Sequence, residues 1–132
     1  MSDAPPQRLQ LRRTKGFNLQ RVSLALNGQH AVNCARPGRF GNPLVVGQRV
    51  GELAVPRNRA EAASMFRAAL EYVRAGGLLC PARLHDRFET ILAHWHELRG
   101  ANTACWCPLP EDGEPDVCHA AMLLEIANET RA

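Results

Sequence analysis

The chain has 132 residues, 45% of them hydrophobic and 22% charged, which is the size and composition of a single globular domain. The formal net charge of +3 is too small to indicate a nucleic-acid partner by itself, and no apolar run approaches the roughly 18 residues of a membrane-spanning helix. The N-terminal residues contain no apolar signal-peptide core, and five cysteines are an odd number for a disulfide framework. We therefore expect a cytoplasmic protein with reduced cysteines and no membrane association.

The first half of the chain predicts short strands and loops. Residues 1–7 are expected to form a flexible tail, and residues 8–132 a single α/β domain. Residues 9–12 alternate apolar and polar side chains and predict a first strand, and residues 31–35 predict a second. Between them, residues 22–26 alternate in the same way and are expected to be strand or loop.

The second half predicts helices around one more strand. Residues 58–75 carry apolar side chains at helical spacing behind a capping asparagine, and residues 82–99 repeat the spacing. Residues 102–107 predict a short strand, and a last helix is expected over about residues 116–129. This order of elements predicts a small Rossmann-like α/β domain, a sheet with flanking helices.

Side chains capable of chemistry concentrate near the end of the chain, at Cys105, Cys107, Cys118 and His119. On a strand, Cys105 and Cys107 face the same way, and Trp106 faces the core on the other side. Cys118 and His119 begin the last helix, where unpaired N–H groups and the helix dipole favour a thiolate. Ligands of open α/β sheets bind at the carboxyl ends of the strands, so we expect these four side chains to share one site there.

Three hypotheses explain this group. In the first, Cys105, Cys107, Cys118 and His119 bind zinc or an iron–sulfur cluster, although the spacing departs from common zinc motifs and adjacent helical residues diverge by about 100°. In the second, a metal-free active site uses Cys118 as a nucleophile or His119 as a general acid or base. In the third, the cysteines are packed core residues. The sequence leaves all three open.

The loop over residues 36–43 is a second candidate for ligand contact. It holds two glycines and two prolines, which exclude a helix or central strand and let the backbone approach a ligand closely. Two arginines three positions apart can clamp a phosphate or carboxylate, with an amide beside them, and another arginine follows the first strand. The residues expected to bind this anion, in one pocket with the cysteine–histidine pair, are Arg13, Arg39 and Asn42.

Four segments taken together resemble a known family. They are Leu11-Arg-Arg-Thr-Lys-Gly16, Arg36-Pro followed by Gly41-Asn-Pro43, Leu98-Arg-Gly followed by Ala104-Cys-Trp-Cys-Pro108, and Cys118-His-Ala followed by Leu123-Leu-Glu-Ile-Ala-Asn128. The resemblance is to an uncharacterised bacterial and phage family, the domain-of-unknown-function family numbered 4326. It covers about residues 8–129 and implies a small cytoplasmic α/β domain without an established activity. Ala121 stands where that family usually has an acidic residue, and Phe40 where it usually has Trp.

From these features we expect a protein that binds a small anionic ligand such as a nucleotide or nucleoside derivative, with turnover left open. The site is formed by the Gly41-Asn-Pro43 loop and the helix start at Cys118 and His119. The alternative hypothesis is a zinc-stabilised, non-catalytic binding module for nucleic acid or a protein partner. A nucleic-acid partner is less favoured, because the chain has a single lysine and no basic run with interleaved aromatic residues. The oligomeric state is left open.

Overall fold

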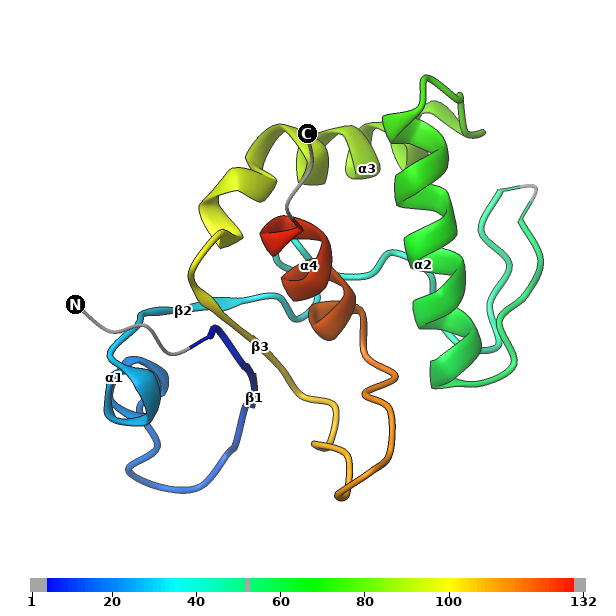
Figure 1. Ribbon diagram of the computed structural model, residues 1–132. Coiled ribbons are helices and arrows are strands. Elements are labelled where there is room, and N and C mark those ends of the chain that lie inside the picture. The colour runs from blue at the N-terminus through cyan, green and yellow to red at the C-terminus, as the bar shows by residue number, and fades with distance from the viewer. Residues whose placement is uncertain (1–4, 52, 130–132) are drawn as a thin grey trace.

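Three short parallel strands form the centre of the fold. In the computed structural model, which describes residues 5–51 and 53–129, β1 (Arg8–Gln10), β2 (Ala31–Asn33) and β3 (Asn102–Cys105) form one sheet in the order β1-β3-β2 (Figure 1). The last strand in sequence lies between the two early ones, and all four of its residues are buried there. Because the strands are parallel, the loops that follow all three leave the sheet at the same edge.

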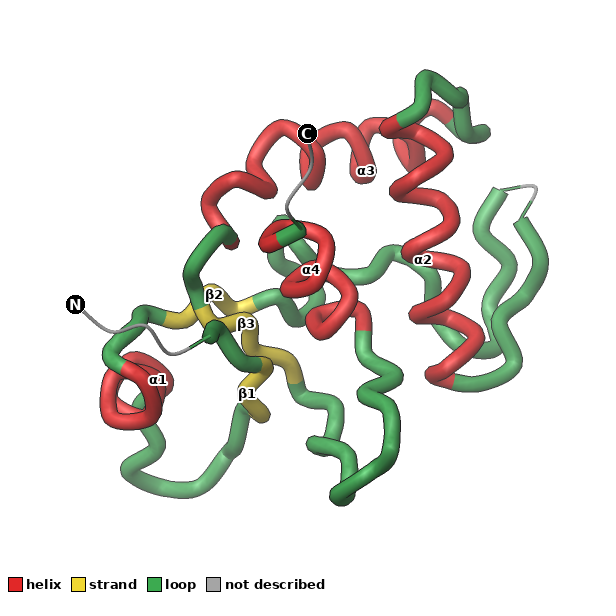
Figure 2. The backbone as a smooth tube through the Cα atoms, viewed as in Figure 1, coloured by secondary structure: helices red, strands yellow, loops and turns green. Residues whose placement is uncertain are grey.

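In the described part of the chain, helices surround this sheet: α1 (Leu19–Asn27), α2 (Arg59–Arg74), α3 (Ala82–His94), the short 3-10 helix η1 (Trp95–Leu98) and α4 (His119–Asn128). Figure 2 shows α2, α3 and α4 gathered together and α1 apart from them. Two neighbouring residues of β3 show which helix lies on which face of the sheet. Asn102 donates to Ser23 of α1 at 2.7 Å, and Thr103 donates to the Ala120 carbonyl of α4 at 2.9 Å. Since successive strand residues point to opposite faces, α1 and α4 lie on opposite faces of the sheet.

The core between α2, α3 and α4 fixes the start of α4. The Phe66 and Phe88 rings are fully buried, with centroids 5.6 Å apart. The His119 ring meets Phe66 edge-on at 5.4 Å. Burying each phenylalanine stabilises the fold by about 1.5–3 kcal/mol. His119, the first residue of α4, therefore packs against a stable part of the core.

The expectation of strand or loop over residues 22–26 was wrong, because this segment is part of α1. Asn18 caps the helix by accepting a hydrogen bond from a backbone N–H of the first turn. The buried face of α1 is polar and consists of Ser23 and Asn27. The large apolar side chains of this helix, Val22, Leu24 and Leu26, are exposed. Apolar periodicity therefore followed the solvent face of the helix and not its buried face.

The other expected elements are present with shifted ends. The helix expected over 58–75 is α2, and Asn58 caps it by accepting the N–H of Glu61 at 2.8 Å. The helix expected over 82–99 is divided into α3 and η1. The first two strands are shorter than expected, and the last helix begins at His119 instead of near residue 116.

The strand expected over 102–107 ends at Cys105, which changes the surroundings of Trp106. Trp106 was expected in the core but is 44% exposed. Residues 1–4 of the expected tail lie outside the described residues, whereas Gln7 donates its N–H to the Asn102 side chain at 2.8 Å. No helix among the described residues combines the length and the apolar character that crossing a membrane requires.

Candidate functional site

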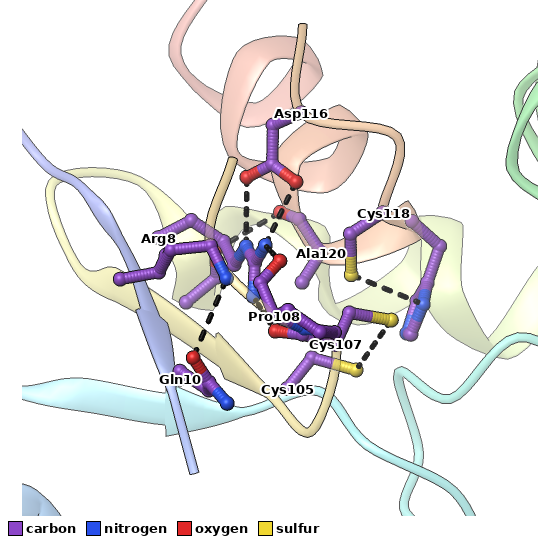
Figure 3. A network of polar contacts seen from close by, with 11 residues as sticks. Arg8, Gln10, Cys105, Cys107, Pro108, Asp116, Cys118 and Ala120 are labelled. Carbon is purple, nitrogen blue, oxygen red and sulfur yellow. Dashed lines mark hydrogen bonds and ion pairs between the residues drawn. The ribbon is translucent and has the colours of Figure 1, made fainter. Parts of the chain in front are cut away.

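Three cysteine sulfurs meet at the carboxyl edge of the sheet. Figure 3 shows the side chains of Cys105, Cys107 and Cys118 turned toward one another. The sulfurs of Cys105 and Cys107 are 4.0 Å apart, and the sulfur of Cys118 is 4.0 Å from Nδ1 of His119. One ligand-type atom each from Cys105, Cys118 and His119 lies within 4.8 Å of the others, and these three residues are buried. The structure thus brings together the four residues that the sequence placed in one site, here called the cysteine–histidine cluster.

The backbone at the start of α4 explains how adjacent residues reach one point. Cys118 is the residue before the first helical turn and has an extended conformation, with φ −119° and ψ 141°. The separation of about 100° applies only between two residues inside a helix. The expectation that Cys118 and His119 diverge was therefore wrong. On the other side, Cys107 lies beyond the end of β3, in a bend that brings its sulfur back to Cys105.

The imidazole of His119 has a defined orientation. Its Nε2 lies 2.6 Å from the carbonyl oxygen of Cys34, which only an N–H group can approach in this way. Burial lowers the pKa of His119, so the ring is neutral near pH 7. With the proton on Nε2, the lone pair of Nδ1 is left on the side of Cys118.

The three thiols share hydrogen bonds unequally. Hydrogen bonds from Cys105 and Cys118, together with the nearby Arg59 guanidinium, lower the pKa of Cys107. The hydrogen bond with Cys107 raises the pKa of the Cys105 thiol against an opposing effect of Cys118, and the hydrogen bonds with Cys105 and Cys107 raise the pKa of the Cys118 thiol. The cluster therefore favours a thiolate at Cys107, the half-buried member, with the two buried thiols as donors.

Arg8 holds the two segments that carry the cysteines of the cluster. No sequence pattern indicates this role. Its guanidinium donates to the carbonyl oxygens of Cys107 at 2.6 Å and Pro108 at 2.8 Å, and it forms a two-point ion pair with Asp116 (Figure 3). It therefore fastens the turn after Cys105 to the segment before Cys118. Arg8 lies just before the strand expected over residues 9–12, and nothing in the sequence pairs it with Asp116.

A cavity of about 260 Å³ adjoins the cluster. Its lining includes Arg36, Arg59 and Trp106 as well as all four members of the cluster. No Asp or Glu lines it in the described part of the chain. The first residues of α2 and α4 both take part, so two helix N-termini add their positive dipole ends. This is a positive cavity beside nucleophilic and metal-ligating atoms.

The loop over residues 36–43 forms one wall of this cavity. A Cβ at Gly41 would lie 2.9 Å from the Cα of Arg36, so glycine is what lets the loop fold back over Arg36. Asn42 lines the cavity, while its side chain accepts the N–H of Leu44 at 2.9 Å and donates to the Ala62 carbonyl at 3.2 Å. The bond to Ala62 anchors the loop to the first turn of α2, and the bond from Leu44 fixes the Asn42 side chain within its own segment.

Of the arginines expected to bind an anion, Arg36 of the predicted two-arginine clamp lines the cavity, whereas Arg13 and Arg39 lie outside the lining. Arg39 forms an exposed ion pair with Glu97 at 3.1 Å. The guanidinium carbon of Arg13 lies 4.9 Å from the ring centroid of Trp106, so Arg13 contacts the cavity wall from outside. Arg59 was not predicted, and its only sequence feature is its place directly after a helix-capping asparagine.

A larger cavity of about 650 Å³ lies elsewhere, against the outer side of α2, and is lined by apolar side chains such as Met65, Tyr72 and Leu79. It is open and contains no member of the cysteine–histidine cluster. We place the candidate site in the smaller cavity, because that is where arginines, thiols and an imidazole come together.

The resemblance seen in the sequence is confirmed by comparison with family models. The model described as Domain of unknown function (DUF4326) matches residues 11–129. This range contains the cluster and the loop over 36–43 but not Arg8. The chain matches none of the curated proteins and none of the solved structures.

Proposed function

The chain belongs to the family described as Domain of unknown function (DUF4326), and from its site we propose that it binds a small anionic ligand, such as a nucleotide or nucleoside derivative, beside Cys118 and His119. One observation carries the proposal. Arg36 and Arg59 line a single cavity to which no Asp or Glu of the described residues contributes. Planar guanidinium groups bind phosphate and carboxylate through two parallel hydrogen bonds, which suits them to this ligand class.

The local field supports the same ligand. Low-dielectric walls with charges of one sign concentrate the electrostatic potential inside a cavity. The two helix N-termini at α2 and α4 add to the potential of the guanidinium groups, and N–H groups at such positions bind anions. The exposure of Arg36 and Arg59 places them at the entrance, where they can attract an anion from solution.

The dimensions favour a compact ligand. About 260 Å³ is at the small end for ligand sites, which suits a phosphate with part of a nucleoside better than a dinucleotide. Trp106 offers a half-exposed aromatic face at the wall, on which a base can stack. The Rossmann-like character of the sheet is part of this proposal, because open parallel sheets bind such ligands at the carboxyl ends of their strands. Turnover by Cys118 or His119 is supported by the place of both residues in the cavity lining.

Calorimetric titration with AMP and with inorganic phosphate tests the proposal. The variants Arg36→Ala and Arg59→Ala should each weaken AMP binding by about tenfold to a hundredfold, since a hydrogen bond to a charged group contributes about 1.5–3 kcal/mol. Arg39→Ala is the matched control, because its guanidinium is held by Glu97 outside the lining. The proposal fails if the unmodified protein binds neither probe at millimolar concentration, or if Arg39→Ala weakens binding as much as Arg59→Ala.

The alternative, a zinc-stabilised and non-catalytic module for nucleic acid or a protein partner, is favoured by the cysteine–histidine cluster alone. Binding of a small anion and binding of a macromolecule are both compatible with a metal in the cluster. The two functions differ in what is bound. A short single-stranded oligonucleotide in the same titration separates them. Under the alternative it binds more tightly than AMP, with an affinity that falls steeply as salt is raised.

A further inference from the structure

We infer that Cys105, Cys107, Cys118 and His119 form a tetrahedral zinc site with three thiolate ligands and one imidazole ligand. The inference is independent of anion binding, because it rests on the cysteine–histidine cluster and not on the arginines of the cavity. It is an alternative to turnover by Cys118 or His119, because a thiolate and an imidazole nitrogen bound in a closed zinc site cannot act as a nucleophile or a general base. Zinc sites with three Cys and one His are closed structural sites, in which the ion stabilises the fold.

The distances between the candidate ligand atoms are close to those that zinc requires. With Zn–S of about 2.3 Å and Zn–N of about 2.0–2.1 Å, ligand atoms at tetrahedral angles lie about 3.5–3.8 Å apart. The Cys105–Cys107 sulfur distance and the Cys118–His119 sulfur–nitrogen distance are both 4.0 Å. The atoms of Cys105, Cys118 and His119 all lie within 4.8 Å of one another. Side-chain shifts of a few tenths of an ångström up to about one ångström bring these atoms to ligation distance.

The imidazole is already oriented for ligation. Histidines that bind metals nearly always donate their other ring N–H to a carbonyl or carboxylate, which fixes the tautomer and the ring plane. His119 makes this bond through Nε2 to the Cys34 carbonyl at 2.6 Å. Its Nδ1 is the atom beside Cys118. A histidine that only packed in the core would not need its second nitrogen directed at a group of thiols.

The donor set selects the metal. Three sulfurs and one nitrogen suit zinc or iron–sulfur chemistry, whereas calcium and magnesium require oxygen ligands. The four ligands come from two segments that the fold holds rigidly. The bend with Cys107 is held by Arg8 through its carbonyl, and Arg8 also holds Asp116, two residues before Cys118. A divalent ion with three thiolates has a net charge of about −1, and the positive groups next to it are Arg59, which contacts Cys107, and Arg8.

Metal content of the full chain, purified without a metal-affinity tag and in a reducing buffer, tests the inference. Elemental analysis should find about one zinc ion per chain. Replacing the zinc with Co²⁺ should produce the intense visible bands of a tetrahedral site and sulfur-to-cobalt charge transfer in the near ultraviolet. Removing the metal with a strong chelator should lower the melting temperature, because the binding free energy is lost from the folded state. Iron in place of zinc would overturn the assignment.

Variants locate the metal. Cys107→Ser, which changes the half-buried ligand, should reduce the cobalt charge-transfer intensity by about a third as three thiolates become two. Cys80→Ser is the matched control, because Cys80 is an exposed free thiol outside the cluster, and should leave the spectrum unchanged. Cys105→Ser with Cys118→Ser should abolish binding, and circular dichroism shows whether that variant folds. The inference is overturned if the unmodified protein holds no zinc and gives no cobalt spectrum, or if Cys107→Ser leaves both unchanged.

Discussion

Arg8 and Asp116, 108 residues apart in sequence, form a two-point ion pair, with Nε 2.7 Å from one carboxylate oxygen and Nη2 2.8 Å from the other. The Arg8 side chain is only 3% exposed and that of Asp116 is 21% exposed. Although burial acts to lower it, the hydrogen bond with Asp116 raises the pKa of Arg8 above its ordinary value. The pair joins β1 to the segment before α4, and the same guanidinium holds the turn that contains Cys107. A residue at the start of the first strand thereby sets the distance between the two halves of the cysteine–histidine cluster.

Arg8→Met should lower the free energy of unfolding by about 3 kcal/mol, because it leaves Asp116 and two carbonyl oxygens without their partner in a largely buried place. Chemical denaturation measures the loss. Arg57→Met is the matched control. The Arg57–Glu61 ion pair is formed by a side chain that is 84% exposed, and its removal should cost less than about 1 kcal/mol. Equal losses in the two variants would contradict the bracing role of Arg8.

Asn102→Leu should be one of the more destabilising substitutions in the chain. The Asn102 side chain is fully buried, and it donates to Ser23 at 2.7 Å and to Asn27 at 2.9 Å, while its oxygen accepts from Asn27 and from the backbone of Gln7. Leucine removes these partners at once, and each buried polar group left unsatisfied costs about 1–3 kcal/mol. We expect a loss of about 3 kcal/mol or more, with faster amide exchange in α1.

Thr103→Val is the comparison for this prediction. It changes the next residue of the same strand and removes a single hydrogen bond, from Thr103 to the Ala120 carbonyl of α4. Its cost should be about 1–2 kcal/mol. If Asn102→Leu costs no more than Thr103→Val, the polar network does not hold α1 in place.

This network also explains why α1 could not be predicted. A helix is recognisable in a sequence when apolar side chains recur on one face, and α1 buries Ser23 and Asn27 instead. Their partner, Asn102, lies 75 positions beyond Asn27, so no local pattern reveals that a polar face is buried. By contrast, α2 follows its apolar spacing and its asparagine cap, and it was predicted to within a residue at each end.

The candidate site also has a part that the sequence predicts and a part that only the fold reveals. The cysteines and His119 were predictable as a group, because a strand end and a helix start follow one another closely in sequence. Arg36 and Arg59 meet in the cavity only through the fold, since one follows β2 and the other begins α2. Arg39 was the stronger sequence candidate, but the structure pairs it with Glu97 of η1, a contact that spacing cannot predict.

Alkylation should distinguish Cys34 from Cys80. Burial raises the pKa of Cys34 to about 12, while Cys80 is exposed. Iodoacetamide reacts with the thiolate, so at pH 8 Cys80 should be modified before Cys34, which should react only on unfolding, as measured by mass spectrometry of peptides. An unfolded thiol titrates near 8.5. The raised pKa of Cys34 therefore adds to the free energy of unfolding. This contribution is complete below about pH 8.5 and is lost as the pH rises toward 12. Equal modification rates in the folded protein would contradict this prediction.

The two tryptophans should report separately on the proposed ligand. The chain contains only Trp95 and Trp106. Trp106 is 44% exposed and lines the cavity beside the cysteine–histidine cluster. Trp95 lies against Arg74, whose guanidinium carbon is 4.4 Å from the centroid of the Trp95 ring. In Trp95→Phe the remaining fluorescence comes from Trp106, and adding AMP should change its intensity and emission maximum, because a stacked base replaces water on the ring.

Trp106→Phe provides the matched control, since its remaining tryptophan is outside this cavity. Its emission should not respond to AMP at concentrations that saturate Trp95→Phe. Arg59→Ala in the Trp95→Phe background should move the response to concentrations about tenfold or more higher, because the phosphate loses a charged hydrogen-bond partner. A response that follows Trp95 would place the ligand near Trp95 and Arg74 instead of beside the cluster. A response unaffected by Arg59→Ala would show that the base binds away from the cavity that Arg59 lines. Either result would remove the link between Trp106, the arginines and the cysteine–histidine cluster on which the proposed function depends.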